Sequence, residues 1–200
     1  MKTQIAAAAS VFLLVACGGG SNGQVGGGGG SNGGGGNNGG GGNDQASFSQ
    51  MQSRGEALIE KINGQDETPV ASMPATGTAT YRGIAGFAAP EAFMVPEDEV
   101  EFEVLSEATL TADFGASTIA GSLTNFRDYE NTAMAGSVSI DNGQIADNSF
   151  AADLAGTVGD KPVEGILNGG FLGADAKTIV GFIEGTIGGE DVLGILGAEQ

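Results

Sequence analysis

Residues 99–114, EVEFEVLSEATLTADF, decide the fold of this chain, because polar and apolar residues alternate along them with period two. Glutamate, threonine and aspartate take the odd positions, whereas apolar residues such as Phe102 and Leu110 take the even ones. Only Leu105 and Ser106 interrupt the alternation. Successive side chains of a strand point to opposite faces, so the stretch predicts a β-strand with one buried face and one face in water.

A tight turn after this strand sets the register of the next one. Gly115 and Ala116 predict the turn, because glycine adopts positive φ without strain. The turn places apolar or small residues opposite one another in three pairs: Ala112 with Ile119, Leu110 with Gly121, and Ala108 with Leu123. The two strands are therefore expected to form an antiparallel pair with a shared buried face.

The alternation returns along the rest of the chain and predicts a mainly β fold. A first strand is expected at residues 77–88, and further turns at Asp141-Asn142-Gly143, at residues 159–162 and at residues 188–189. Eight strands joined by short turns form an antiparallel up-and-down barrel, which leaves no exposed edge. The predicted interior consists of Phe102, Leu110, Ile119, Leu123, Phe150, Leu154, Leu167 and Phe171, whereas Ile166 and Leu172 are expected to face outward.

A membrane-spanning barrel is the alternative architecture, and the outer face argues against it. Such a barrel has an apolar outer band with aromatic girdles. Here Glu99, Glu101, Glu103 and Asp113 fall on the predicted outer face, tryptophan is absent and there are two tyrosines. We therefore expect the barrel wall to face water.

Residues 48–63 change to helical periodicity. Phe48, Met51, Leu58 and Ile62 recur at spacings near three and four, and Asn63-Gly64 marks the end. This pattern predicts one amphipathic helix that either packs on the barrel or plugs it. Two X-Pro steps follow before residue 75 and predict an extended connection.

The N-terminus has the layout of a secretory signal peptide, with Lys2, an apolar run from Ile5 to Val15 and small residues before a cut. The sequence Leu14-Val15-Ala16-Cys17 resembles the lipobox of bacterial lipoproteins. The resemblance implies that the thiol of Cys17 takes a diacylglycerol and that the new amino terminus is acylated, for example with palmitate. A buried cysteine after a core helix is the alternative, and the extreme N-terminal position argues against it.

The segment from Gly18 to Asn43 consists of glycine, asparagine and serine with Gln24 and a single apolar residue, Val25. It cannot bury apolar surface to offset its chain entropy, so we expect a disordered tether with a reach of roughly 25–30 Å. The predicted organisation is a signal peptide at residues 1–16, the lipidated cysteine and tether at 17–44, a helix and connector at 45–75, and a barrel domain at 76–200.

Composition excludes several classes of function. A net charge of −18 with seven lysines and arginines argues against a nucleic-acid partner and against docking on an anionic membrane. The absence of histidine removes Ser-His and Cys-His nucleophiles, imidazole metal sites and histidine-ligated haem. We therefore predict a protein that is not an enzyme and has no cofactor and no catalytic residue. Cys17 is the only cysteine, which excludes a disulfide within the fold.

An acidic cluster lies at the start of the strand predicted at residues 99–114. Glu97, Asp98 and Glu99, with Glu101 and Glu103, could supply oxygen ligands to a cation such as Ca²⁺. The spacing is not that of an EF-hand loop, and a solvated strand face explains the same residues. No metal site is predicted, and cation binding by this cluster stays an open alternative.

Several motifs also resemble a known family. Residues 77–83 (GTATYRG), 108–115 (ATLTADFG) and 118–121 (TIAG) with Asn125-Phe126, and the closing residues 194–198 (GILGA), resemble the barrel of transferrin-binding-protein-B-like surface lipoproteins. Phe171 to Ala176 (FLGADA) resembles a Phe-Phe-Gly-Pro-x-Ala turn of that family, with alanine in place of proline. The resemblance implies an eight-stranded barrel on an outer-membrane lipoprotein, displayed at the cell surface. The handle domain of the family is missing, so the resemblance does not imply transferrin binding.

Two functions follow as expectations. In the first, the chain is an outer-membrane lipoprotein, anchored through Cys17, whose barrel binds a protein or nutrient at the cell surface. An outer-membrane receptor or translocator is a further candidate partner, and the periplasmic face is the alternative location. In the second, the chain is a lipocalin-like carrier that holds a small molecule inside the barrel. The sequence identifies no ligand-binding residue.

Overall fold

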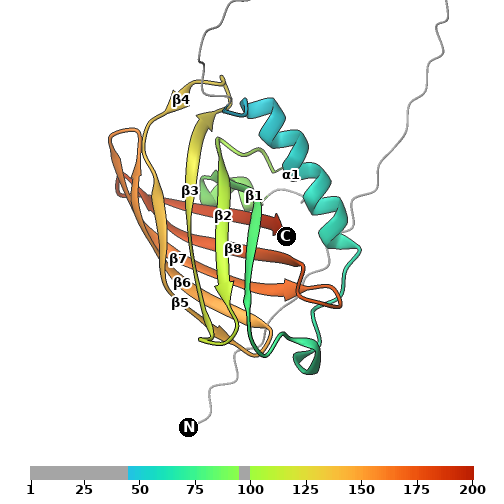
Figure 1. The fold of residues 1–200 in the computed structure, drawn as a ribbon. Coiled ribbons are helices and arrows are strands. Elements are labelled where there is room, and N and C mark those ends of the chain that lie inside the picture. Colours follow the sequence, from blue (N-terminus) through green and yellow to red (C-terminus); the bar gives the residue numbers. More distant parts are fainter. Residues whose placement is uncertain (1–44, 95–99) are drawn as a thin grey trace, which may run out of the picture.

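The structure, a computed structural model, describes residues 45–94 and 100–200. A helix lies along the outside of a closed β-barrel (Figure 1). The elements in chain order are α1 (Phe48–Asn63), η1 (Val70–Ser72), β1 (Thr78–Ala88), η2 (Pro90–Met94), β2 (Val104–Asp113), β3 (Thr118–Asp128), β4 (Ala133–Met134), β5 (Val138–Ala146), β6 (Ser149–Val158), β7 (Lys161–Leu172), β8 (Thr178–Ile187) and β9 (Glu190–Glu199).

The barrel closes because each strand pairs with an antiparallel neighbour and β2 also pairs with β3. The strand order is β2-β1-β9-β8-β7-β6-β5-β3, and the two-residue β4 pairs with the end of β3. The predicted mainly β, eight-stranded antiparallel barrel preceded by one helix is therefore confirmed. The predicted register of β2 and β3 is confirmed as well, since Ala112 pairs with Ile119, Leu110 with Gly121 and Ala108 with Leu123.

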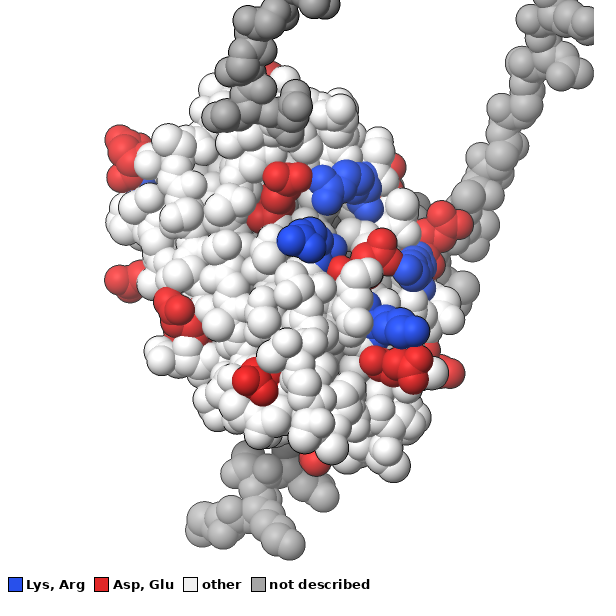
Figure 2. All heavy atoms as spheres, in the orientation of Figure 1, with Lys and Arg blue, Asp and Glu red and all other residues white. Residues whose placement is uncertain are grey.

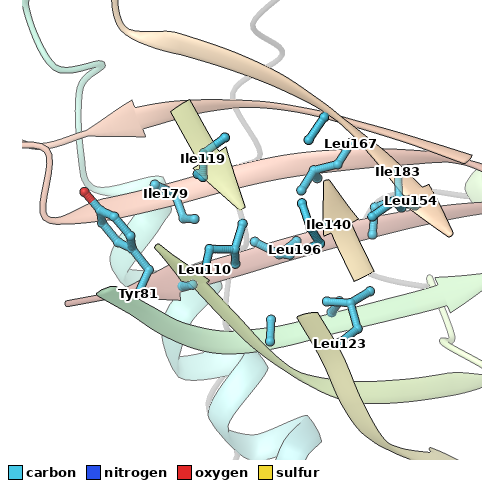
Figure 3. Close-up of a cluster of buried hydrophobic side chains, with 14 of the residues drawn as sticks. Tyr81, Leu110, Ile119, Leu123, Ile140, Leu154, Leu167, Ile179, Ile183 and Leu196 are labelled. Atoms are coloured by element: carbon cyan, nitrogen blue, oxygen red, sulfur yellow. The ribbon is translucent and has the colours of Figure 1, made fainter. Parts of the chain in front are cut away.

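Apolar side chains from the strands fill the barrel interior. Figure 3 shows side chains from opposite walls pointing toward one another, and those of Leu110, Ile140 and Leu196 are fully buried. Phe171 is also fully buried, and its ring centroid lies 5.5–6.0 Å from those of three other aromatic residues, Tyr81, Phe114 and Phe150. Eight strands enclose a space that side chains can fill, and here they do so.

Phe102 was predicted to lie in the barrel interior, and the structure places it outside the barrel. β2 begins at Val104, not at residue 99, and residues 100–103 lie outside any strand. The chain there lies over the outer face of the barrel, where Phe102 packs with the cluster formed by α1 and Ile84. Its ring lies 2.7 Å from the position that a Cβ would take on Gly86. The other predicted interior residues are in the core.

The prediction of a turn at Asp141-Asn142-Gly143 is wrong. β5 continues to Ala146 and the chain reverses at Asp147-Asn148 instead. The Asn-Gly pair forms an irregularity within the strand, where the register with β6 shifts between Asp141 and Gln144. Asn142 has a φ of 54°. Some bulges and the tight type I′ hairpin turn both use such left-handed residues, so the same sequence signal fits either one.

The predicted helix is confirmed as α1, and it packs on the barrel and does not plug it (Figure 1). A capping box starts it: the amide of Gln50 donates to Ser47 Oγ at 3.3 Å, and the Ser47 amide donates to Gln50 Oε1 at 2.8 Å. Met51 and Leu58 are buried against the outward-facing Ile84 and Leu105. The helix therefore covers the outer face where β1 and β2 meet.

The connector after α1 covers the outward-facing Leu172, which is buried, through the bridge that Glu67 forms with it. Ile166, the other residue predicted to face outward, is exposed. Within the described ranges, no helix is long and apolar enough to cross a bilayer. The predicted signal peptide, the lipidated Cys17 and the tether lie outside the described residues.

Candidate functional site at the long-loop end

The two ends of the barrel differ in the length of their connections. One end has tight reversals after β2, β5 and β7, together with the connector that follows α1. The other end, here called the long-loop end, has the connection from β1 to β2 and the segment 129–137 between β3 and β5, together with two-residue turns after β6 and β8. The start of α1 and β4 lie at this same end (Figure 1). Binding residues are disproportionately found on loops that a rigid scaffold holds.

A hydrogen-bonded turn at this end presents an exposed aromatic side chain. The Thr132 amide donates to Asp128 Oδ1 at 2.7 Å, and the Asn131 amide donates to the Asp128 carbonyl oxygen at 2.8 Å. Tyr129 lies within this turn with 69% of its surface exposed. Because the backbone on both sides is fixed, the ring is presented with little backbone entropy left to lose on binding.

The same turn is attached to the start of α1. The Phe48 amide donates to Asn131 Oδ1 at 2.8 Å. Arg127 Nε donates to the Ala46 carbonyl oxygen at 2.9 Å, and Arg127 Nη1 donates to the Asn131 carbonyl oxygen at 3.1 Å. Asn131 has a φ of 67°, a conformation that asparagine tolerates better than most residues. The helix start, the end of β3 and the Tyr129 turn therefore form one connected unit.

Asn125, within β3, also binds the segment that starts α1. Its φ is 53°, and its Nδ2 donates to the Ala46 carbonyl oxygen at 3.1 Å and to Glu107 Oε2 at 3.4 Å. Arg54 Nη1 donates to the other oxygen of Glu107 at 2.8 Å. Asn125 Oδ1 is buried and has no hydrogen-bond partner among the described residues. Two hollows of about 570 and 340 Å³ open beside these contacts; the first is lined by Ala46, Ser49, Gln50, Ser53, Arg54 and Glu107, and the second by Gln45, Asn125, Phe126 and residues 133–136.

The connection from β1 to β2 adds a second exposed apolar side chain. Met94 ends η2 and is 85% exposed. The ring centroid of Phe93 lies 6.3 Å from that of Phe102 in an edge-on arrangement, and the Glu103 amide donates to the Phe87 carbonyl oxygen at 2.9 Å. These contacts hold both sides of the connection against the barrel.

Charge is unevenly distributed over the face that Figure 2 shows. Most lysine and arginine side chains on that face gather beside and below α1, next to carboxylates, while the rest of the face carries scattered acidic side chains. Two ion pairs are present there, Arg54 with Glu107 and Lys61 with Glu199. Such exposed pairs contribute little stability each, and they leave few cations free to attract an anionic ligand.

The acidic cluster of the sequence is only partly described. Glu101 and Glu103 are exposed, whereas Glu97, Asp98 and Glu99 lie outside the described residues. In the part of the chain that the structure describes, no three acidic or cysteine side chains lie close enough together to hold a metal ion.

The sequence reasoning missed the Tyr129 unit. Its signal is present in the run Asp128-Tyr129-Glu130-Asn131-Thr132, where turn-forming residues surround an aromatic one. That signal identifies a turn. It does not show that Asn131 and Arg127 bind the start of a helix some eighty positions earlier.

Tyr81 shows how tightly the opposite end is closed. Its hydroxyl donates to the Ala176 carbonyl oxygen at 2.5 Å, and Gln200 Nε2 donates to the same hydroxyl at 3.2 Å. Burial raises the pKa of Tyr81, and the hydrogen bond from Gln200 lowers it by a smaller amount. The hydroxyl is therefore neutral over the physiological range and serves as a structural link.

Comparison with known proteins places this barrel in a family. Residues 73–200 match the family described as the C-lobe and N-lobe β-barrels of Tf-binding protein B. The chain belongs to this family. The transferrin-binding-protein-B-like resemblance of the sequence motifs is thereby confirmed. No curated protein matches the chain in sequence.

The chain is also similar to several solved structures. The intact Ap-TbpB with N and C lobes is 18% identical with a TM-score of 0.46, covering 68% of this chain and 28% of that one. The isotype 1 transferrin-binding protein B of serogroup B Neisseria meningitidis is 21% identical with a TM-score of 0.44, covering 66% and 27%. A protein described as a surface lipoprotein is 17% identical with a TM-score of 0.41, covering 66% and 64%. The family barrel therefore spans little more than a quarter of the two transferrin-binding proteins.

Proposed function

We propose that this chain is a lipoprotein of a bacterial outer membrane, anchored through Cys17 and displayed at the cell surface, that binds a protein or nutrient through its long-loop end. Its role is binding and not catalysis. The proposed organisation is a cleaved signal peptide, a glycine-rich tether and one family barrel with its own helix. The Leu14-Val15-Ala16-Cys17 motif supports the anchor, and the family supports the surface location.

The observation that supports binding outside the barrel is the filled interior. Leu110, Ile119, Leu167 and Ile179 are fully buried, and their side chains point into the interior of the barrel (Figure 3). A ligand inside would have to displace such side chains, and interiors packed to this degree resist insertion of extra volume. The lipocalin-like carrier is therefore the weaker candidate.

The long-loop end offers the features of a protein-binding surface. Tyr129 is an exposed aromatic residue on a hydrogen-bonded turn, and Met94 is an adaptable apolar one. Hot spots of protein interfaces are enriched in tyrosine, because the ring brings large contact area and a polar hydroxyl at low entropic cost.

The location is tested with intact cells. Protease added outside should digest the chain, and Cys17→Ser should abolish incorporation of labelled fatty acid and release the chain from the membrane fraction. A chain that survives protease on intact cells, and is digested only after the outer membrane is opened, would place the protein on the periplasmic side.

The binding surface is tested by capture of ligands with the full chain, followed by measurement of affinity for each captured protein. Tyr129→Ser should weaken binding by about 30-fold, the usual loss for an aromatic hot spot. Val70→Ser is the matched control, since Val70 is 55% exposed in the connector at the opposite end. Equal affinity of both variants and the original chain would refute the long-loop end as the binding surface.

Native mass spectrometry of chain purified from its host tests the carrier alternative, which a retained small molecule would support.

A further inference from the structure

Among the described residues, the outer wall formed by β7, β8 and β9 carries an exposed apolar surface, distinct from the long-loop end. Ile166 and Phe182 are 44% and 50% exposed, although both lie in the middle of regular strands. They point outward because their neighbours Leu167 and Ile183 are buried in the interior. Val180, Leu193 and Ile195 face the same side and are partly exposed. These five residues are called the β7–β9 apolar face.

Strand register joins these residues into one patch. Phe182 lies directly opposite Ile195, and Glu184 lies opposite both Ile166 and Leu193. Phe182 and Ile166 are diagonal neighbours, a spacing within reach of aromatic side chains. An aromatic residue offers about 150–250 Å² of surface, so half-exposed Phe182 alone leaves roughly 100 Å² of contact area.

The apolar face continues a surface that the chain already covers elsewhere. Ile195 pairs with Gly86, on which the Phe102 ring lies. Further along β9, Ile62 Cδ1 lies 3.0 Å and Leu58 Cβ 3.7 Å from the position of a Cβ on Gly197. One apolar band therefore crosses the outer wall. The helix α1 and Phe102 cover its side on β1, β2 and the end of β9, whereas the β7–β9 apolar face stays partly exposed among the described residues (β7 and β8 cross behind β1 and β2 in Figure 1).

The acidic residues around the β7–β9 apolar face favour a partner of opposite charge. The outward positions of β6 to β9 carry no lysine or arginine, and they carry five acidic residues: Asp153, Glu164, Glu184, Asp191 and Glu199. Among these, Glu199 is paired with Lys61. A partner with apolar side chains bordered by lysine and arginine would bury the patch and neutralise this field.

Two other occupants fit less well. Residues 18–43 contain a single apolar residue, Val25, so the tether has no side chains with which to cover the patch. A second copy paired by two-fold symmetry would bring Glu184 and Glu164 toward the same residues of its partner, and like charges in an interface are unfavourable.

We propose that the β7–β9 apolar face is a docking site for a basic, amphipathic segment of another protein, with Phe182 as its central anchor. The closed barrel offers no free strand edge in this wall, so recognition depends on side chains and not on strand addition. This site is independent of the proposed ligand-binding role of the long-loop end.

The test uses the purified full chain and two synthetic peptides of about 15 residues, which are long enough to present one helical face. One peptide, here called Leu/Lys, carries leucines at helical spacing on one face and lysines on the other face. The second peptide, Leu/Glu, has glutamate in place of lysine. Binding is measured by fluorescence anisotropy at low and high salt. The Leu/Lys peptide should bind, with affinity falling as salt rises, and the Leu/Glu peptide should bind at least tenfold more weakly.

Variants locate the binding. Phe182→Ala should weaken binding of the Leu/Lys peptide by about 30-fold, and Ile166→Ser should weaken it as well, whereas Val70→Ser and Tyr129→Ser should leave it unchanged. Circular dichroism confirms that each variant folds. The proposal is overturned if binding survives both β-strand changes, if the two peptides bind equally, if Phe182 instead mediates dimerisation, or if zwitterionic phosphatidylcholine vesicles bind the face and the peptide does not.

Discussion

Truncation of Phe171 tests whether the barrel interior is a packed core. Phe171 is fully buried in β7, and its ring centroid lies 6.0 Å from that of Tyr81, 5.6 Å from Phe114 and 5.5 Å from Phe150. All three pairs are tilted or edge-on, arrangements that aromatic rings prefer. Phe171→Ala removes the ring that the three aromatic pairs share and leaves a cavity near the end of the barrel opposite the long-loop end.

The expected loss follows from the burial. Phe→Ala changes in packed cores cost about 3–5 kcal/mol, as lost transfer energy plus the energy of the cavity. For a domain of this size, each kcal/mol lowers the melting temperature by about 2–4 °C, so the variant should melt roughly 6–20 °C lower. A domain with a total stability of about 5–15 kcal/mol can lose a large fraction of it in this way.

The assay is thermal and urea unfolding of the full chain, followed by far-ultraviolet circular dichroism because the chain lacks tryptophan. Phe182→Ala is the matched control: it is the same substitution in the adjacent strand at a residue that is 50% exposed, and it should cost less than about 1 kcal/mol. Equal losses for the two variants, or a loss below about 1 kcal/mol for Phe171→Ala, would refute the packed interior and restore the carrier alternative.

Three further changes test other parts of the structure. Ser47→Ala removes the capping box and should cost about 0.5–2 kcal/mol, with faster hydrogen exchange in the first turn of α1 and no change in the strands. Gly83→Ala should destabilise the barrel by about 1–3 kcal/mol in urea unfolding, because its Cβ would overlap the Gly197 carbonyl oxygen, whereas in Gly64→Ala the Cβ would lie 3.7 Å from its nearest neighbour and should be tolerated. Burial raises the pKa of Tyr81 in the folded chain. Its contribution to stability is therefore complete below the unfolded pKa of about 10 and is lost as pH rises through the folded pKa. Unfolding measured from about pH 9 to pH 12 should show a loss of stability that Tyr81→Phe lacks. A pH dependence that is the same in both proteins would contradict the assignment to Tyr81.

Local signals of the sequence predicted the elements well where one period dominates. The helix at residues 48–63 and the pairing of β2 with β3 follow from spacing and from one turn, and both are confirmed. The break at Leu105 and Ser106 also has a structural counterpart, because the register of β2 against β3 shifts between Leu105 and Glu107. Such features depend only on residues close in sequence.

The errors arise where one local signal fits two structures. Asn142-Gly143 suits a hairpin turn and a bulge, and only the pairing of β5 with both β3 and β6 selects the bulge. Phe102 continues the alternation of β2, but the chain leaves the strand before Val104 and folds back over Gly86. In each case contacts with distant strands outweigh the local pattern.

The sequence by itself determined the class of the fold and the limits on chemistry, because alternation, charge and the absence of histidine are properties of composition and order. Only the tertiary structure decided which surfaces are available for binding. Closure of the barrel brings β9 beside β1, so α1 can cover one side of the outer apolar band while Phe182 stays exposed on the other. The contact of Asn131 with the start of α1, which holds the Tyr129 turn, likewise joins segments 83 residues apart. The physical reason is that burial depends on which faces meet, and that meeting follows from closure of the whole sheet and not from the pattern of any one strand.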